Sequence, residues 1–226
     1  MKTTIRQIAK VKSNFKEKFG IPRQSGRANS IKSQIIFNKE FSSPDAFREL
    51  EGFSHVWILF DFSLSHTQHF TPTVRPPRLG GNKKVGVFAS RSPFRPNNIG
   101  LSCVKLENIE FDKQGIAILT VSGADILDGT PVYDVKPYLS FTDSIPDASL
   151  GYTKDYVNHK LKVVFDKDLK INLSQTLINE IVQCLSDDPR PSYQNDERTY
   201  GMKYASYDVL FKVKDDILTI IDIKNV

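Results

Sequence analysis

The sequence predicts a mostly β protein, in which an antiparallel sheet or barrel precedes a small α+β unit. Short strand-like segments follow one another through the first half of the chain, and spacers rich in Gly and Pro separate them. No amphipathic helix of about 10–15 residues lies between these segments, which excludes the alternating βαβ pattern of a doubly wound sheet. Beyond Phe141 the pattern changes to a polar stretch, a strand, a helix and a hairpin.

The first half carries the predicted strands, which are short runs of apolar, aromatic and β-branched side chains. Lys12–Asn29 contains Gly20, Pro22 and Gly26 and predicts a long loop. Pro44 begins a predicted short helix through Leu50, with Ser43 as its N-cap. The predicted strands are Thr4–Val11, Ser33–Phe37, His55–Phe62, Val85–Ala89, Leu101–Phe111 and Gly115–Ser122.

The second half begins with a predicted linker, Thr142–Thr153, which is polar and contains Pro146 and Gly151. We therefore expect two domains, at residues 1–142 and 153–226. Apolar side chains at helical spacing, after Ser174 as N-cap, predict a helix over Gln175–Leu185. Predicted strands flank it at Leu161–Phe165, Tyr204–Val213 and Ile217–Ile223, and Lys214–Asp216 has the character of a hairpin turn.

Charge is distributed unevenly along this chain of 226 residues, whose formal net charge is +5. Residues 1–110 hold 18 Lys and Arg against 8 Asp and Glu, and no acidic residue occurs from Phe62 to Leu106. A basic stretch of this kind is typical of proteins that bind nucleic acid. The alternative is that these cations are spread over several faces and paired with acids elsewhere.

Several classes of protein are disfavoured by what the sequence lacks. There is no Walker loop and no G-x-G-x-x-G after a strand, since Gly80-Gly81 lies in a Pro-rich loop. The two cysteines, Cys103 and Cys184, are far apart and predict neither a disulfide framework nor a zinc site. No apolar run is long enough to span a bilayer, and the N-terminus lacks the pattern of a secretory signal. We expect a cytoplasmic protein.

One dense motif lies between two predicted strands, at residues 89–102. Arg91 and Arg95 alternate with prolines there, and prolines restrict the backbone at low entropic cost. Two arginine side chains held in this way suit a carboxylate or a phosphate. A rigid surface connection, with both arginines paired to acids, explains the motif equally well.

A second motif places Asp125 and Asp128 around an apolar pair and before a Gly-Thr-Pro turn. Two close carboxylates can bind a cation, accept hydrogen bonds from a ribose or ammonium group, or act as a base. They can also serve only to satisfy backbone donors in turns. His66 and His69 lie three residues apart, but the sequence supplies no third metal ligand beside them. We therefore expect no metal site.

A third motif, residues 188–193, places Arg190 and Tyr193 on a predicted exposed loop. Arginine and tyrosine side chains on a loop suit stacking on unpaired bases, and they also suit an ordinary protein interface.

Taken together, these motifs resemble the tRNA methyltransferase O family, also called the TsaA-like family. The resemblance rests on FGIPRQ, TPTVRPPRLGGN, RSPFRPNNIGLS, DILDGTPVYDVKPYL and DPRPSY, in order along almost the whole chain. It implies a single-sheet antiparallel β-barrel that uses S-adenosyl-L-methionine (SAM) and acts as a homodimer. The implied reaction is methylation of N6 of N6-threonylcarbamoyladenosine at position 37 of tRNA, 3′ of the anticodon. The resemblance also implies that the C-terminal unit helps to bind tRNA.

The resemblance also implies which residues form the site. Beyond the resemblance, our hypothesis is that Asp128 is the base, that Arg91 or Arg95 lies near the threonyl carboxylate, and that Arg95 anchors the substrate. The chain departs from the family pattern at Ser25 and Asn98, where Pro is common, and over Ser63–His69. The implied cofactor contacts are Arg23, Gln24, Ser25, Ser65, His66, Arg91, Leu101, Asp125, Ile126, Leu127 and Asp128.

Two other classes of function compete with this enzyme. A non-catalytic RNA-binding module on the same barrel would bind tRNA without the cofactor. A metal-dependent hydrolase using Asp125, Asp128 and His66 would lose its activity with a chelator.

Overall fold

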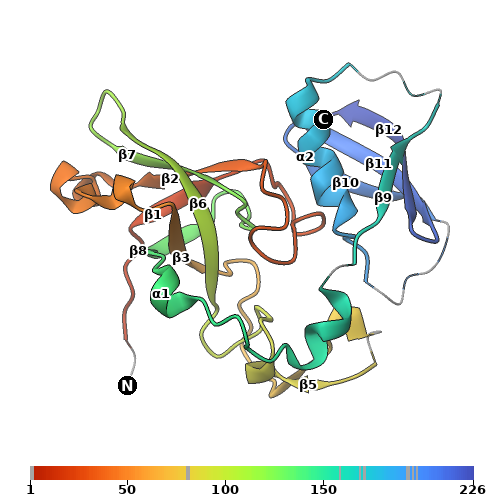
Figure 1. The fold of residues 1–226 in the computed structure, drawn as a ribbon, viewed down its shortest axis with the longest axis horizontal. Coiled ribbons are helices and arrows are strands. Elements are labelled where there is room, and N and C mark those ends of the chain that lie inside the picture. Colours follow the sequence, from red (N-terminus) through yellow and green to blue (C-terminus); the bar gives the residue numbers. More distant parts are fainter. Residues whose placement is uncertain are drawn as a thin grey trace.

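A closed antiparallel barrel forms the first part of the structure (Figure 1). The computed structural model describes residues 3–79, 82–157, 159–167, 169, 172–191, 194, 196 and 198–226. The barrel order is β1-β2-β7-β6-β3-β8, and pairing of β1 with β8 closes it, which confirms the predicted antiparallel barrel. Its strands are β1 (Ala9–Lys12), β2 (Lys32–Phe37), β3 (His55–Asp61), β6 (Ile99–Phe111), β7 (Ala117–Ser122) and β8 (Pro131–Pro137).

Alternation of apolar and polar side chains accounts for the barrel interior. In β3 the side chains of Val56, Ile58 and Phe60 are buried, and the residues between them are partly exposed. Ile35 of β2 and Leu119 of β7 are fully buried in the same cluster. Each barrel strand therefore presents one face to a common core, whose burial is the main favourable term in folding.

Strand β8 was not predicted, although it closes the barrel. It begins at Pro131 and ends at Pro137, and Asp134 and Lys136 lie inside it, so the segment lacks the apolar run typical of a strand. Proline is tolerated at a strand end, where its missing N–H breaks no ladder bond. Pairing with β3 and β1 on its two sides overrides the weak local signal.

The predicted helix over Pro44–Leu50 is wrong. Two short 3₁₀ turns, η2 (Pro44–Phe47) and η3 (Leu50–Gly52), replace it, and another, η1 (Lys39–Phe41), precedes them. Glu49 has a left-handed backbone (φ 68°), which separates η2 from η3, and Ser43 makes no side-chain capping bond. Burial of Phe47 against the Phe37 and Phe111 rings holds the segment in this form.

Between β3 and β6 the chain forms a loop region in place of the predicted strand Val85–Ala89. Only its first two residues are extended, as β5 (Val85–Gly86), which pairs with β4 (Thr73–Val74). The next three residues form the 3₁₀ turn η5 (Val87–Ala89), and η4 (Pro77–Leu79) lies before β5. Buried Val87 directs this turn inward.

A second sheet, in the order β10-β11-β12-β9, packs against helix α2 (Gln175–Ser186) and forms the predicted α+β unit (Figure 1). The Ser174 hydroxyl accepts a hydrogen bond from the Leu177 N–H, which confirms the predicted cap. The predicted strand Tyr204–Val213 begins later, at Tyr207, because Ala205 turns the chain with φ 52°, and the strand before this turn was not predicted. The strands are β9 (Lys162–Phe165), β10 (Tyr200–Tyr204), β11 (Tyr207–Lys214) and β12 (Ile217–Asn225).

The segment between the barrel and the second sheet contains α1 (Ser140–Asp143) and the 3₁₀ helix η6 (Gly151–Tyr156). In Figure 1 it runs beneath the barrel toward the second sheet. The division of the chain into domains at residues 142–153 stays a prediction. Within the described ranges, no helix combines the length and the apolar character that crossing a bilayer requires.

The long loop of residues 13–31 connects the two halves physically. Phe15, Ala28 and Ile31 are buried in the hydrophobic cluster of the second sheet and not in that of the barrel. Phe15 forms an isolated bridge with Tyr204, and its ring lies edge-on to that tyrosine, 5.5 Å between centroids. The second core is therefore completed by a segment that belongs to the barrel half of the sequence.

Candidate active site

A cleft of about 1000 Å³ opens at one end of the barrel. Its walls come from the loop of residues 21–24, the segment after β3, the arginine-rich loop before β6 and the turn after β7. Of the residues implied by the resemblance, those that line it are Arg23, Gln24, Ser65, Arg91, Arg95, Leu101, Asp125 and Leu127. Ser25, His66, Ile126 and Asp128 are placed outside this lining.

Of the two aspartates in this motif, Asp125 is the one that lines the cleft. Its Oδ1 accepts a hydrogen bond of 2.5 Å from the Ser102 hydroxyl of β6, and the Ser25 backbone also donates to it. Burial raises the pKa of the Asp125 carboxyl, and the Ser102 hydrogen bond and the Arg91 charge offset that only in part. The carboxylate is therefore available to accept a hydrogen bond from a ligand, at some cost in desolvation.

Asp128 has a different environment, although it follows only three residues later. Its carboxylate accepts from the Lys16 ammonium at 2.8 Å and from the Ser13 N–H at 2.9 Å. Burial opposes its ionisation, but the hydrogen bonds from Lys16 and Ser13 outweigh this and lower the pKa of Asp128. A carboxylate paired in this way is a weak base. The catalytic role expected for Asp128 stays a prediction.

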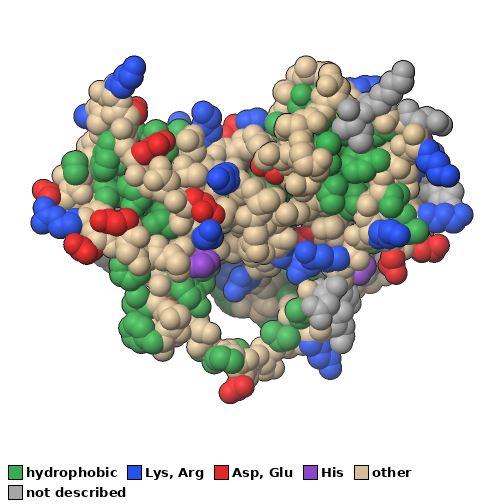
Figure 2. Space-filling view, turned by 45° about the horizontal axis from the view of Figure 1, so that its top comes forward, with side chains coloured by type: hydrophobic (Ala, Val, Ile, Leu, Met, Phe, Trp, Pro, Cys, Tyr) green, Lys and Arg blue, Asp and Glu red, His purple; other side chains and the backbone are tan. Residues whose placement is uncertain are grey.

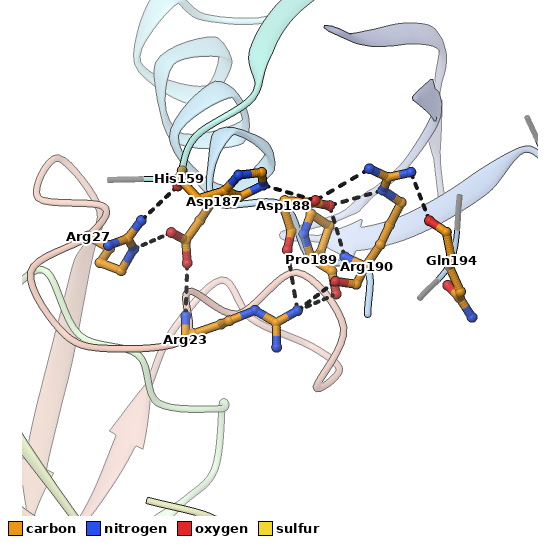
Figure 3. Close-up of polar contacts among 8 residues, drawn as sticks. All are labelled: Arg23, Arg27, His159, Asp187, Asp188, Pro189, Arg190 and Gln194. Atoms are coloured by element: carbon orange, nitrogen blue, oxygen red, sulfur yellow. Dashed lines mark hydrogen bonds and ion pairs between the residues drawn. The ribbon is translucent and has the colours of Figure 1, made fainter. Parts of the chain in front are cut away.

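Arg91 reaches the 21–24 loop from the opposite wall. Its Nη1 donates to Gln24 Oε1 at 2.5 Å, and both side chains line the cleft. Arg23 points the other way: its Nη2 donates to the Arg190 carbonyl at 2.7 Å and to two neighbouring carbonyls at 3.4 Å (Figure 3). The loop therefore meets both the arginine-rich segment and the C-terminal unit.

The arginine-rich loop is held by its own polar groups. Arg95 Nη1 donates to the carbonyls of Val87 (3.1 Å) and Ser90 (2.7 Å), and its guanidinium lies 5.7 Å from the Phe88 ring centroid. Asn98 Nδ2 donates to Pro93 O at 2.7 Å and to Ser65 O at 3.1 Å. These bonds fix the loop, so Arg95 is presented to the cleft in one orientation.

Of the two histidines that the sequence analysis singled out, His66 and His69, only His69 lines the cleft. His66 Nε2 pairs with Asp61 Oδ1 at 2.8 Å, and Ser65 Oγ accepts from the Lys18 ammonium at 3.0 Å. Across the described part of the chain, no group of three or more His, Cys, Asp or Glu side chains is arranged to hold a metal ion.

The predicted exposed loop at residues 188–193 is only partly described, and the prediction is wrong for Arg190. The Arg190 side chain is buried and donates from Nε to Asp188 Oδ1 at 3.0 Å. Burial opposes ionisation of Asp188, but the hydrogen bonds and charge of Arg190 outweigh this and lower the pKa of Asp188. Tyr193 lies outside the described residues. Arg190 thus pairs internally and is not available to stack on a base.

The sequence did not reveal several residues that line the cleft, among them Lys18, Asp61, Ser102 and Tyr152. Among these residues, Asp61 could have been recognised most easily from the sequence, because it is an acidic residue in an otherwise apolar strand. Tyr152 lies in the predicted linker and carried none. Figure 2 shows Lys and Arg side chains along the edge of a hollow on one face of the molecule.

Comparison with known protein families matches both halves of the chain. Residues 10–144 match the model of the tRNA-methyltransferase O N-terminal domain. Residues 158–226 match that of the TrmO C-terminal domain.

Individual relatives are similar over nearly their whole length. The chain is 41% identical over 218 residues to the tRNA (adenine(37)-N6)-methyltransferase of Escherichia coli, covering 92% of each chain. It is 37% identical over 233 residues to a putative S-adenosylmethionine-dependent methyltransferase, RcsF, of Pseudomonas aeruginosa, covering 99% of this chain and 98% of that one. A crystal structure of TrmO from Pseudomonas aeruginosa superposes with a TM-score of 0.77 at 32% identity and covers all of both chains.

Proposed function

Since the chain belongs to the tRNA methyltransferase O family, we propose that it transfers a methyl group from SAM to N6 of the adenosine at position 37 of tRNA. The finer substrate in this proposal is N6-threonylcarbamoyladenosine. The observation that carries the proposal is the cleft itself, because one wall presents a half-buried carboxylate and another presents arginines.

The residues of the cleft fit SAM chemically. The cofactor carries an ammonium and a carboxylate on its methionine part, two ribose hydroxyls and a flat adenine. Asp125 suits a hydroxyl or ammonium donor, Arg91 suits the carboxylate, and apolar Leu101 and Leu127 suit the adenine face. The volume of about 1000 Å³ lies at the upper end of the range for ligand pockets and leaves room for a nucleoside beside the cofactor.

Methyl transfer mainly requires the protein to hold the cofactor and the acceptor nitrogen in the right relative position. SAM supplies an electrophilic methyl group on a sulfonium. The cleft residues must then align the acceptor nitrogen and exclude water. We assign Asp125 and Arg91 to holding the cofactor. Arg95, whose Nη1 is fixed by the Val87 and Ser90 carbonyls, is assigned to the threonyl carboxylate of the substrate.

Calorimetric titration of SAM and S-adenosylhomocysteine tests the cofactor site. We expect micromolar binding by the wild type and at least about 10-fold weaker binding by Arg91→Ala, because a charge-assisted contact is lost. Arg6→Ala is the matched control: Arg6 pairs with Glu40 outside the cleft and should bind like the wild type. Methyl transfer to tRNA with and without threonylcarbamoyl at position 37 then tests the substrate.

The competing function is a non-catalytic RNA-binding module on the same barrel. It predicts tRNA affinity with no binding of SAM, in the presence or absence of tRNA. That result would remove the enzyme proposal, whereas SAM binding without methyl transfer to threonylcarbamoylated tRNA would overturn only the substrate assignment.

We further propose that the enzyme is a homodimer. The segment between the barrel and the second sheet exposes large apolar side chains: Phe141 is 86% exposed, Ile145 69% and Leu150 54%. Large apolar side chains that are this exposed and close together in the sequence are consistent with a protein interface.

A further inference from the structure

The loop that follows α2, at residues 187–190, contacts Arg23 (Figure 3), and Arg23 lines the cleft. The Asp187 carboxylate, which is only 4% exposed, accepts from the Arg23 backbone N–H at 3.1 Å through Oδ2. Its other oxygen accepts from Arg27 Nε. The Arg23 guanidinium in turn donates hydrogen bonds to the carbonyls of residues 188–190. Contacts therefore run in both directions between the loop after α2 and the loop at the cleft.

The loop after α2 is itself rigidly built. Asp188 has a left-handed backbone (φ 50°), and its carboxylate accepts from the Arg190 N–H at 3.2 Å and from the Arg190 guanidinium. His159 Nε2 lies 3.4 Å from the same carboxylate, and Arg190 Nη1 donates to Gln194 O at 3.2 Å. A turn fixed by this many buried bonds can hold the segment that it contacts.

The contact continues from Arg23 into the cleft. Gln24 Nε2 donates to the Arg23 carbonyl at 2.6 Å, and Gln24 Oε1 accepts from Arg91 Nη1 at 2.5 Å. Arg91 is the residue that we assign to the cofactor carboxylate. An unbroken series of hydrogen bonds thus joins the end of α2 to the cofactor site.

We infer that Asp187 is a positioning residue for the cofactor site: it holds the Arg23–Gln24 segment, and through Gln24 it orients Arg91. The C-terminal unit then forms part of the SAM site, in addition to any contact with tRNA. This inference rests on the proposed function, because it concerns the same cleft.

The test compares two acid-to-amide variants of the full-length protein. Asp187→Asn keeps the size of the side chain but turns an amide N–H₂ toward Arg23 N–H or Arg27 Nε, the two donors described above. We expect its dissociation constant for SAM to rise about 10-fold, and its KM for SAM to rise more than its KM for tRNA. Glu180→Gln is the matched control. Glu180 is also buried on α2 and bonds to Tyr204 and Asn14, away from the cleft, so SAM binding should change less than about twofold.

A double-mutant cycle with Gln24→Ala separates positioning from general loosening of the fold. If Asp187 acts through Gln24 and Arg91, most of the effect of Asp187→Asn on SAM binding disappears in the Gln24→Ala background. Fully additive effects, equal effects of Asp187→Asn and Glu180→Gln, or wild-type binding by Asp187→Asn would each overturn the inference while leaving the proposed function intact.

Two further measurements keep the inference testable. Hydrogen exchange needs no ligand: the Arg23 amide should exchange faster in Asp187→Asn than in Glu180→Gln, and equal rates would overturn the inference even if the wild type failed to bind SAM. If Asp187→Asn does not fold, Arg27→Gln removes the other donor to Asp187. A folded Arg27→Gln variant should weaken SAM binding severalfold, and unchanged binding would contradict the inference.

Discussion

Asp125 and Asp128 lie three positions apart on the same turn and differ in what surrounds them. The Asp125 carboxylate lies in the cleft beside Ser102, and burial raises its pKa. The Asp128 carboxylate is bonded to Lys16 and Ser13, and these bonds lower its pKa against the effect of burial. The first is suited to a ligand, and the second ties the turn to the loop of residues 13–31.

This contrast predicts how SAM binding depends on pH. The ionised form of Asp125 is the acceptor, so binding should weaken as the pH falls through its pKa, which lies above that of an ordinary aspartate. Asp125→Asn should bind SAM about 10-fold more weakly at neutral pH and lose this dependence. Titration calorimetry across the acidic range measures both.

Asp128→Asn is the control for this prediction. It should retain the pH dependence of SAM binding and turn over at close to the wild-type rate, because its carboxylate lies outside the cleft lining. A large loss of turnover in Asp128→Asn, at unchanged cofactor affinity, would restore Asp128 as the base.

At the scale of secondary-structure elements, the close packing of the start of β6 against β3 requires a glycine at position 100. Gly100 pairs with Phe60 of β3, and a Cβ added at Gly100 would overlap the Phe60 ring. Phe60 packs edge-on against Phe62, and both phenylalanines line the cleft. The close approach of these two strands therefore shapes one wall of the site.

Gly100→Ala should lower the free energy of unfolding by about 1–3 kcal/mol, because the Phe60 ring must move into a packed region. SAM binding should weaken as well. Gly86→Ala, where an added Cβ meets nothing within 4 Å, is the control and should change stability by less than about 0.5 kcal/mol. Chemical denaturation measures both variants, and equal stabilities would show that Phe60 adapts without cost.

Elements with a strong local pattern could be predicted from the sequence, and those that depend on distant partners could not. β3 and α2 carry clear periodicity and were predicted within a residue or two. β8 has no such pattern and forms because β3 and β1 pair with it. The burial of Arg190 was not predicted either. Its partner Asp188 is only two residues away, but Arg23, which donates to the Arg190 carbonyl, is 167 residues away in the chain.

In the candidate site, too, local motifs could be predicted from the sequence, and contacts between distant segments could not. The arginines and the Asp125 turn were predicted from dense polar motifs, and the structure brings them to one cleft. Which of the two aspartates faces the cleft depends on Lys16 and Ser13, more than a hundred residues away in the chain. The role that we propose for Asp187 depends on a contact with Arg23, which is 164 residues away in the chain.

For the whole molecule, the exposed apolar side chains of α1 and of the segment that follows it predict self-association. Light scattering at micromolar concentration should give the mass of a dimer. Phe141→Asp should shift it toward the monomer, since a charge cannot be buried at such an interface without cost. Ile5→Asp, which alters an exposed apolar side chain outside this segment, is the comparison and should leave the mass unchanged. A monomeric wild type would remove the dimer proposal.

The position of the loop of residues 13–31 also bears on how such proteins can be recombined. Phe15, Ala28 and Ile31 complete the second core, and Gly20 lies so close to Met202 that no side chain fits between them. A C-terminal unit grafted from a relative would meet a foreign loop at each of these contacts. The piece that can be exchanged as a module is therefore discontinuous in sequence: the C-terminal residues together with the loop that the barrel half contributes to them.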